Sequence, residues 1–220
     1  MRHIDTTGIP VKQAMTYEFM QQRQRFKALL IQRFQVSEHT YDQISQLLAP
    51  IVQPFRLRKG EYLQRSGEAA RNLRWLTQGV ARVAYLTESG SEVTLRFAME
   101  GDTANAFEDL LQTPDEPAGP HFIIAETSVA GFSLEWADLL DLRTQHQVIT
   151  DYHIKVLEYR LKQHAQRNYQ SSASDAQSRL DTFRTDYPGL EQRISQKVLA
   201  SYLGITPPYL SQLLRQPPSD

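Results

Sequence analysis

The side chains best suited to recognising another molecule lie near the C-terminus, between residues 196 and 215. Two runs of apolar residues at helical spacing meet there at Gly204, and Thr206 followed by two prolines opens the second run. Two helices that cross at a short turn need a small residue at the crossing and a residue that tolerates positive φ in the turn. Ala200 and Gly204 meet these needs, so the pattern predicts a helix-turn-helix. The residues expected to fill the angle between the helices are Leu199, Leu203, Ile205, Leu210 and Leu213.

In a helix-turn-helix that binds nucleic acid, the second helix enters the major groove of the duplex. Thr206, Tyr209 and Gln212 would then reach base edges, and a glutamine suits a bidentate contact with adenine. The residues placed to hold phosphates are Ser195, Gln196, Lys197 and Arg215. The alternative is a structural corner of two helices, in which Tyr209 is packed and Gln212 is merely solvated.

Elsewhere the sequence offers little that suggests catalysis. It contains no glycine-rich phosphate loop, no nucleophile elbow and no paired-histidine metal motif. His146 and His153 lie seven residues apart on one predicted helix face, but such a pair is far more often packed or solvated than metal-binding. We therefore expect a protein that is not an enzyme and that has no cofactor and no metal site.

The composition favours a cytoplasmic protein that does not contact the membrane. The 220-residue chain has 40% apolar residues and no cysteine. Without cysteine there is no disulfide framework, thiolate nucleophile or cysteine-held iron–sulfur cluster. No apolar run reaches the roughly 18 residues of a membrane span, and the first residues lack the apolar core of a secretory signal.

The net charge of −1 conceals an uneven distribution of charge along the chain. Residues 1–34 carry +4, residues 35–142 carry −8, residues 143–170 carry +3, and residues 171–220 are neutral. Between Phe97 and Leu142 there are ten acids and no lysine or arginine. This acidic middle is poorly matched to a nucleotide phosphate, and the neutral end of the chain predicts few phosphate contacts for each monomer.

Periodicity divides the chain into helical ends and a β-rich middle. Apolar residues recur at helical spacing over residues 16–34, and Ser37 can cap a second helix that ends before Pro50. From residue 51 to 133 the period changes to two, and glycines separate the short alternating runs, which indicates a β-roll, sandwich or barrel. The proline-rich residues 112–121 are expected to form an exposed loop.

Helical periodicity returns near Trp136 and continues to about Tyr169, which predicts one long helix. One apolar stripe has coiled-coil-like spacing and is the candidate dimer contact, namely Ile149, Tyr152, Val156 and Tyr159. A second stripe consists of Ile154, Leu157 and Leu161. One stripe would cover the β-rich domain while the other meets a partner, although both could pack inside one monomer. The polar residues 170–174 are predicted to be a linker to three short helices.

In this order of elements, the chain resembles the Crp/Fnr family of bacterial transcription regulators over about residues 37–216. The matching segments are KGE at residues 59–61 with Gly67, GVARV at 79–83, EVTLRF at 92–97, EGD at 100–102, ISQK at 194–197 and LGITP at 203–207. The resemblance implies an α+β fold with N-terminal helices, a cyclic-nucleotide-binding-like β-roll, a long dimerisation helix and a C-terminal helix-turn-helix. It also implies a homodimer that binds double-stranded DNA and a roll that senses a small-molecule effector.

The domains expected from this resemblance have the following bounds. Residues 1–36 form an N-terminal helical extension, which lies largely outside the resemblance. Residues 37–142 form the β-roll sensor domain, and residues 143–170 form the dimerisation helix. Residues 171–220 form the DNA-binding helix-turn-helix domain.

Two departures from the family pattern change what the chain is expected to bind. Family members that bind cyclic nucleotides hold the phosphate with an arginine, but the corresponding stretch, GDTANAFEDLL at residues 101–111, contains none. The remaining weak candidates for a ligand pocket are Arg82, Arg96 and His121. In the reading helix, Pro208 and Gln212 stand where the family often has glutamate and arginine. We expect that cyclic AMP does not bind usefully. Either the operator differs and is read more through adenine and DNA shape, or the motif has decayed.

Two functions remain open at this stage. In the first, the protein is a dimeric transcription regulator whose roll senses a ligand other than a nucleotide, or no ligand. In the second, it is a degenerate relative whose roll and long helix form a ligand- or protein-binding module without sequence-specific DNA binding. The complete register of Ala200, Gly204, Leu210 and Leu213 favours the first function, because a decayed motif would have lost some of it.

Overall fold

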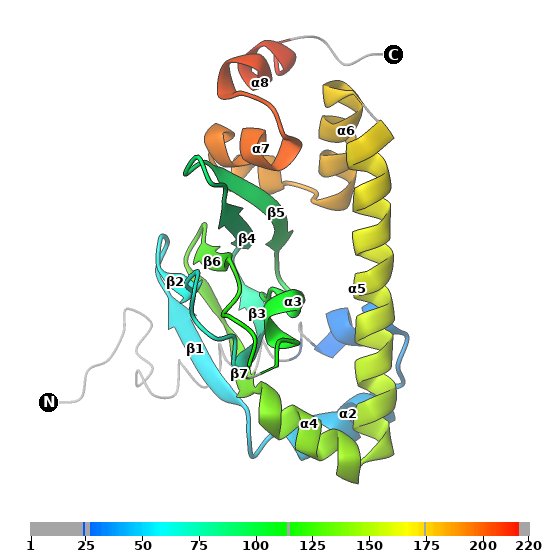
Figure 1. Ribbon diagram of the computed structural model, residues 1–220. Helices are drawn as coiled ribbons and strands as arrows, with labels where there is room; N and C mark the ends of the chain where they lie inside the picture. Colours follow the sequence, from blue (N-terminus) through cyan, green and yellow to red (C-terminus); the bar gives the residue numbers. More distant parts are fainter. Residues whose placement is uncertain (1–23, 25–26, 114, 174, 216–220) are drawn as a thin grey trace, which may run out of the picture.

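The computed structural model describes residues 24, 27–113, 115–173 and 175–215 and has a β-roll flanked by helices (Figure 1). Residues 27–34 are helical and lead into α2 (Glu38–Leu48). Ser37 caps α2, because its hydroxyl accepts a hydrogen bond from the amide of Thr40 at 3.0 Å. The helix predicted over residues 16–34 is thus confirmed for residues 27–34, and most of its earlier part lies outside the described residues.

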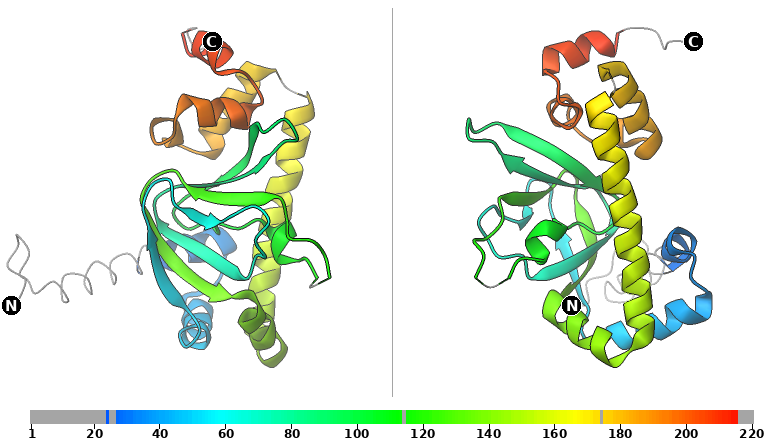
Figure 2. Two further views of the ribbon diagram at one scale, coloured as in Figure 1. Left: turned by 60° about the vertical axis from the view of Figure 1, so that its left-hand side comes forward. Right: turned by 45° about the vertical axis from the view of Figure 1, so that its right-hand side comes forward.

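Two antiparallel sheets make up the β-roll (Figure 2). The first has the strand order β1 (Gln53–Leu57), β7 (Val129–Glu135) and β3 (Asn72–Gln78). The second has the order β2 (Tyr62–Gln64), β6 (His121–Ala125), β4 (Ala81–Leu86) and β5 (Glu92–Ala98). The alternating runs of the sequence therefore form strands, and the predicted α+β architecture with a β-roll is confirmed.

Glycine and proline residues shape the turns and loops that connect the strands. At Gly79, between β3 and β4, φ is +92°, and a Cβ atom would lie 2.2 Å from the carbonyl oxygen of Ser128, so only glycine fits. After β5 the chain forms a short helix, α3 (Phe107–Leu110). The predicted loop follows it, since residues 112–113 and 115–120 form neither helix nor strand.

The single long helix expected after residue 136 is two helices. α4 (Trp136–Gln145) ends at His146, whose backbone is extended with φ −135° and ψ 107°, and α5 (Gln147–Ala173) runs alongside the roll (Figures 1 and 2). The prediction of one helix was wrong because apolar spacing can persist across a change in axis direction. The residues 170–173 that were predicted to be a linker continue α5. No helix in the described part of the chain is long and apolar enough to cross a bilayer.

The first apolar stripe of α5 packs inside the chain. Ile149, Tyr152 and Val156 are 1%, 8% and 5% exposed and belong to a cluster that includes Phe34 from the helix at residues 27–34. The Phe34 ring meets the rings of Tyr152 and Tyr159 edge-on, at centroid distances of 5.5 and 5.6 Å. The structure therefore does not support this stripe as a dimer contact, because the N-terminal helix already covers it.

The C-terminal helices share a core with the roll. They are α6 (Ala176–Asp186), the 3-10 helix η1 (Leu190–Gln192), α7 (Gln196–Leu203) and α8 (Pro207–Leu213). Phe97 of β5 is 1% exposed in the same cluster, and its ring lies 6.0, 5.6 and 5.2 Å from those of Phe183, Tyr187 and Tyr202. The β-roll and the helix-turn-helix are therefore joined by packing as well as by α5.

His153 is a titratable side chain buried between α4 and α5. It is 4% exposed, and its ring stands edge-on to Trp136 at a centroid distance of 5.3 Å. Neither ring nitrogen has a hydrogen-bond partner among the described residues. Burial, with a smaller contribution from the positive charge of Arg143, lowers the pKa of His153 to about 4. The folded chain therefore keeps this imidazole neutral at pH values where the unfolded chain protonates it.

This burial predicts acid sensitivity. Below about pH 6.5 the unfolded state binds a proton at His153 that the folded state refuses until about pH 4, so stability falls across that window. We expect His153 to remove about 3 kcal/mol of unfolding free energy between pH 7 and pH 4. Urea unfolding of His153→Leu should lack this loss, whereas His39→Leu, which changes an exposed histidine on α2, should retain it. An unchanged pH dependence in His153→Leu would contradict the prediction.

Candidate functional site

The structure contains the predicted helix-turn-helix. α7 and α8 meet at Gly204, whose φ of +66° and ψ of 33° give the left-handed conformation that the turn requires. Ser195 caps α7 by accepting a hydrogen bond from the Val198 amide at 3.3 Å. Thr206 caps α8 by accepting one from the Tyr209 amide at 3.4 Å. The prolines that open α8 fit, because the first amides of a helix need no intrahelical partner.

The angle between the two helices is filled as the sequence predicted. Ala200 is 1% exposed, and Ile205 is partly buried against the same cluster. The buried leucines of this cluster on α7 and α8 are Leu199, Leu203, Leu210 and Leu213. The apolar sides of α7 and α8 are therefore buried against each other and the rest of the cluster, and their polar sides face outward.

All of the residues proposed to contact DNA are exposed, namely Ser195, Gln196, Lys197, Thr206, Tyr209, Gln212 and Arg215. Tyr209 is 46% exposed although it is aromatic, which excludes the reading in which its ring is simply packed. Gln196 accepts a 3.3 Å hydrogen bond from the Ser211 hydroxyl, so α7 and α8 are also linked on this surface. Exposure on one rigid unit is what contact with a duplex requires.

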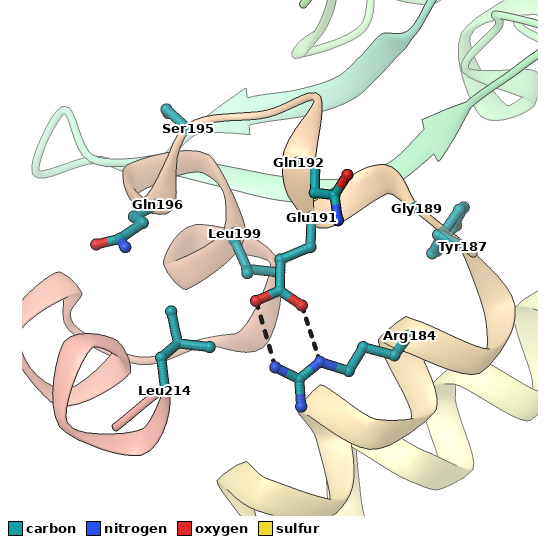
Figure 3. A pocket seen from close by; sticks show the side chains of 9 residues that line it. All are labelled: Arg184, Tyr187, Gly189, Glu191, Gln192, Ser195, Gln196, Leu199 and Leu214. Atoms are coloured by element: carbon teal, nitrogen blue, oxygen red, sulfur yellow. Dashed lines mark hydrogen bonds and ion pairs between the residues drawn. The ribbon is translucent and has the colours of Figure 1, made fainter. Parts of the chain in front are cut away.

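A cleft of about 440 Å³ lies beside the beginning of α7 and is lined by Ser195 and Gln196 (Figure 3). Arg184 and Glu191 face each other across it, with Nε 2.8 Å from Oε2. This pairing raises the pKa of Arg184 above its ordinary value. Because the guanidinium is already neutralised by Glu191, the cleft offers little net positive charge for a phosphate.

Basic residues of the C-terminal helices differ in whether an acidic side chain neutralises them. Arg193 is paired with Glu100 of the roll, with Nη2 2.7 Å from Oε1. Arg184 is paired with Glu191. Lys197 and Arg215 are exposed on α7 and just after α8. Contacts with phosphate should therefore depend on these two side chains, which the sequence had already suggested.

In the β-roll, Arg82 is enclosed by acidic side chains. Its side chain is 6% exposed and forms ion pairs with Glu126 and, at 2.6 Å, with Glu92. Its guanidinium also lies over the Phe122 ring, 5.4 Å from the centroid. Arg82 therefore stabilises the sheet and has two carboxylate partners where an anionic ligand would need an open guanidinium.

The guanidinium of Arg96 is also occupied by hydrogen bonds within the chain. It donates to the backbone carbonyls of Thr103, at 3.0 Å, and Asn105. Burial, followed by repulsion from Arg160, lowers its pKa to about 10. No carboxylate forms an ion pair with it among the described residues. Arg96 holds the segment before α3 in place.

The third candidate, His121, belongs to a polar network that the sequence did not reveal. Its Nδ1 lies 2.6 Å from Oδ1 of Asp109, and the other Asp109 oxygen accepts a 2.7 Å hydrogen bond from Gln64. Asp109 is 3% exposed on α3, in the stretch that corresponds to the nucleotide cassette. No spacing rule could have found this network, because its members come from β2, α3 and β6. His121 therefore has a buried carboxylate as its internal partner.

These contacts predict that the chain does not bind cyclic AMP usefully. We expect heat-flow titration of the full chain to show no binding in the micromolar range, because Arg82, Arg96 and His121 each serve an internal partner. Replacing Asp109 with Ala should not create binding, because the cassette still lacks an arginine. A micromolar dissociation constant for cyclic AMP would contradict this prediction.

The fold and the helix-turn-helix together define the class of protein to which this chain is similar. FixK2 from Bradyrhizobium japonicum matches with a TM-score of 0.62 at 17% sequence identity, over 74% of this chain and 83% of that one. A Crp/Fnr-family transcriptional regulator from Eubacterium rectale matches with a TM-score of 0.62 at 16% identity, over 77% and 80% of the two chains. The chain therefore has the fold of the Crp/Fnr regulators, as the sequence resemblance implied.

A further solved structure extends this likeness. The c-di-GMP-responsive global regulator CLP from Xanthomonas campestris matches with a TM-score of 0.60 at 12% identity, over 77% of this chain and 88% of that one. No protein-family sequence profile matches the chain, and no curated protein matches it in sequence. The likeness is therefore carried by the three-dimensional arrangement of the elements.

Proposed function

We propose that the protein is a homodimeric, DNA-binding transcription regulator of the Crp/Fnr type that acts by binding and not as an enzyme, in the cytoplasm. The observation that carries this proposal is the α7–α8 unit, in which the apolar register is complete and every proposed contact residue is exposed. α8 would enter the major groove, with Thr206, Tyr209 and Gln212 at base edges. Ser195, Gln196, Lys197 and Arg215 would hold phosphates.

Dimer formation is proposed through the second apolar stripe of α5. Ile154 and Leu161 are 44% and 70% exposed, and Leu157 is partly buried. An exposed stripe along a long helix is typical of a helix–helix contact with a second copy. A dimer would place two reading helices on one operator and double the few phosphate contacts of each chain.

This assignment predicts that Leu161→Glu converts the dimer to a monomer. A carboxylate in an apolar seam would lie opposite its symmetry mate and lose its water, so the dimer dissociation constant should rise at least about tenfold. Sedimentation equilibrium measures the change. Lys162→Glu introduces the same group one residue along the helix and should leave the dimer intact. If Leu161→Glu remains as dimeric as the unaltered chain, the stripe is not the interface.

The proposed function is tested by selecting genomic duplex fragments on the full chain and measuring their affinity at several salt concentrations. Specific fragments should emerge, and log affinity should fall with log salt with a slope of about −4, since a dimer presents two copies each of Lys197 and Arg215. Failure to bind any duplex at low salt would instead favour the degenerate binding module. That outcome would remove the proposed role of α8.

A further inference from the structure

A group of exposed basic side chains lies around the connection between β1 and β2, outside the helix-turn-helix. This group, the basic turn, consists of Arg56, Arg58, Lys59 and Arg65. None of them forms an ion pair with an acidic side chain in the part of the chain that the structure describes. Four basic residues and the single acid Glu61 give residues 56–65 a net charge of +3.

The contacts within the basic turn leave its positive charges available. Glu61 accepts a 2.7 Å hydrogen bond from the backbone amide of Arg58, so its carboxylate holds the turn and not a guanidinium. The guanidinium of Arg65 lies over the Tyr62 ring, 4.4 Å from the centroid. An aromatic face can hold a guanidinium in position without neutralising it. The basic turn therefore differs from Arg82, which has two carboxylate partners.

The basic turn lies at the end of the β-roll that contacts the C-terminal helices. The amide of Gly60 donates to the carbonyl of Ala125 at 2.8 Å, and the amide of the next residue, Glu126, donates to the carbonyl of Val80 at 2.8 Å. Val80 is fully buried in the cluster that forms the core of α7 and α8. Figures 1 and 2 show β1 running from the α2 end of the roll toward these helices. The basic turn is thus on the same end of the roll as the α7–α8 unit.

We propose that the basic turn binds the phosphate backbone of the DNA that flanks the operator. This inference rests on the proposed DNA-binding function and enlarges its interface from the α7–α8 unit to the β-roll. A duplex presents regularly spaced phosphates, so it can meet several unneutralised cations at once, and each such contact releases condensed counterions. The added contacts offset the cost of bending the flanks toward the roll.

Two duplexes that carry the same selected operator test the inference on the full chain. One has roughly 26 base pairs, enough for two half-sites one helical turn apart, and the other extends the flanks to roughly 60 base pairs. The unaltered chain should bind the longer duplex about tenfold more tightly. Its plot of log affinity against log salt should be steeper by about 4 or more on the longer duplex, because at least two side chains of each protomer would meet flanking phosphates.

A variant with glutamine at all four positions of the basic turn should bind the two duplexes with equal affinity and equal salt slopes. Because the four side chains are exposed and lie outside α7 and α8, its affinity for the short duplex should match that of the unaltered chain. Arg71→Gln is the matched control. Arg71 is also exposed, but its carbonyl accepts a hydrogen bond from the amide of Trp136 at the start of α4, so this variant should keep the preference for the longer duplex.

The possible outcomes separate this inference from the proposed function. Equal affinity of the unaltered chain for both duplexes would overturn the inference and leave the proposed function standing. A preference for the longer duplex that survives in the fourfold glutamine variant would also overturn it. If neither duplex binds at low salt, the proposed function fails and the inference fails with it.

Discussion

Replacing Gln212 with Ala is expected to weaken binding to the selected operator by about 2 to 6 kcal/mol. A bidentate contact between a side chain and a base contributes about 1 to 3 kcal/mol of discrimination, and a dimer makes the contact at both half-sites. Gln212 is exposed on α8, where it can reach a base edge without any rearrangement of the core. Titrations of labelled duplex against the unaltered chain and the variant give the difference directly.

The specificity of the loss distinguishes base reading from simple electrostatics. Gln212→Ala should reduce affinity for the operator and leave affinity for random duplex and the salt slope nearly unchanged. Lys197→Gln should instead weaken binding to all sequences and make the slope shallower by about 2 for a dimer. Gln177→Ala, which changes the same residue type on α6, is the matched control. Equal loss on operator and random duplex in Gln212→Ala would show that this residue does not read bases.

Replacing Phe97 with Ala is expected to remove about 3 to 5 kcal/mol of unfolding free energy, the usual effect of deleting a buried phenylalanine ring. The ring is 1% exposed and contacts three aromatic rings of the C-terminal helices. The cavity cannot close easily, because β5 and α6 are both held by other contacts. Urea unfolding at constant pH measures the loss.

Two further variants provide a comparison for the loss of unfolding free energy in Phe97→Ala. Phe97→Leu keeps most of the volume and should lose less. Leu86→Ala, at a residue of the adjacent strand that is 51% exposed, should change stability by no more than about 0.5 kcal/mol. A loss in Phe97→Ala as small as that in Leu86→Ala would mean that the roll and the C-terminal helices do not share a core.

Polar contacts reinforce this junction between the β-roll and the C-terminal helices. The Ser201 hydroxyl of α7 donates to the carbonyl of Glu92 at 2.8 Å and accepts from the amide of Thr94 at 2.9 Å. The Arg193–Glu100 ion pair lies nearby and lowers the pKa of Glu100. β5 also carries Arg96, which holds the segment before α3. The roll and α7 are therefore in direct contact through β5, in addition to their connection through α5.

Local sequence patterns correctly predicted the features that depend only on residues close together in the chain. The caps at Ser37, Ser195 and Thr206 and the turn at Gly204 occur where the sequence predicted them, because each is a contact within a few residues. Alternation of period two likewise predicted the strands of the roll. The likeness to Crp/Fnr regulators followed from the order of these locally determined elements.

The sequence by itself therefore determined the strands, the helix-turn-helix and most of the helices, since periodicity and capping act over short distances, but it did not reveal the break between α4 and α5. Only the tertiary structure decided which distant residue each side chain contacts. In the folded chain, the helix at residues 27–34 covers Tyr152 and Val156, and the stripe of α5 that remains exposed contains Ile154 and Leu161. The tertiary structure gave Arg82 two carboxylates, those of Glu92 on β5 and of Glu126 after β6, and joined His121 to Asp109. A residue's type and spacing show what it can bind, but its function depends on the group that packing brings within reach.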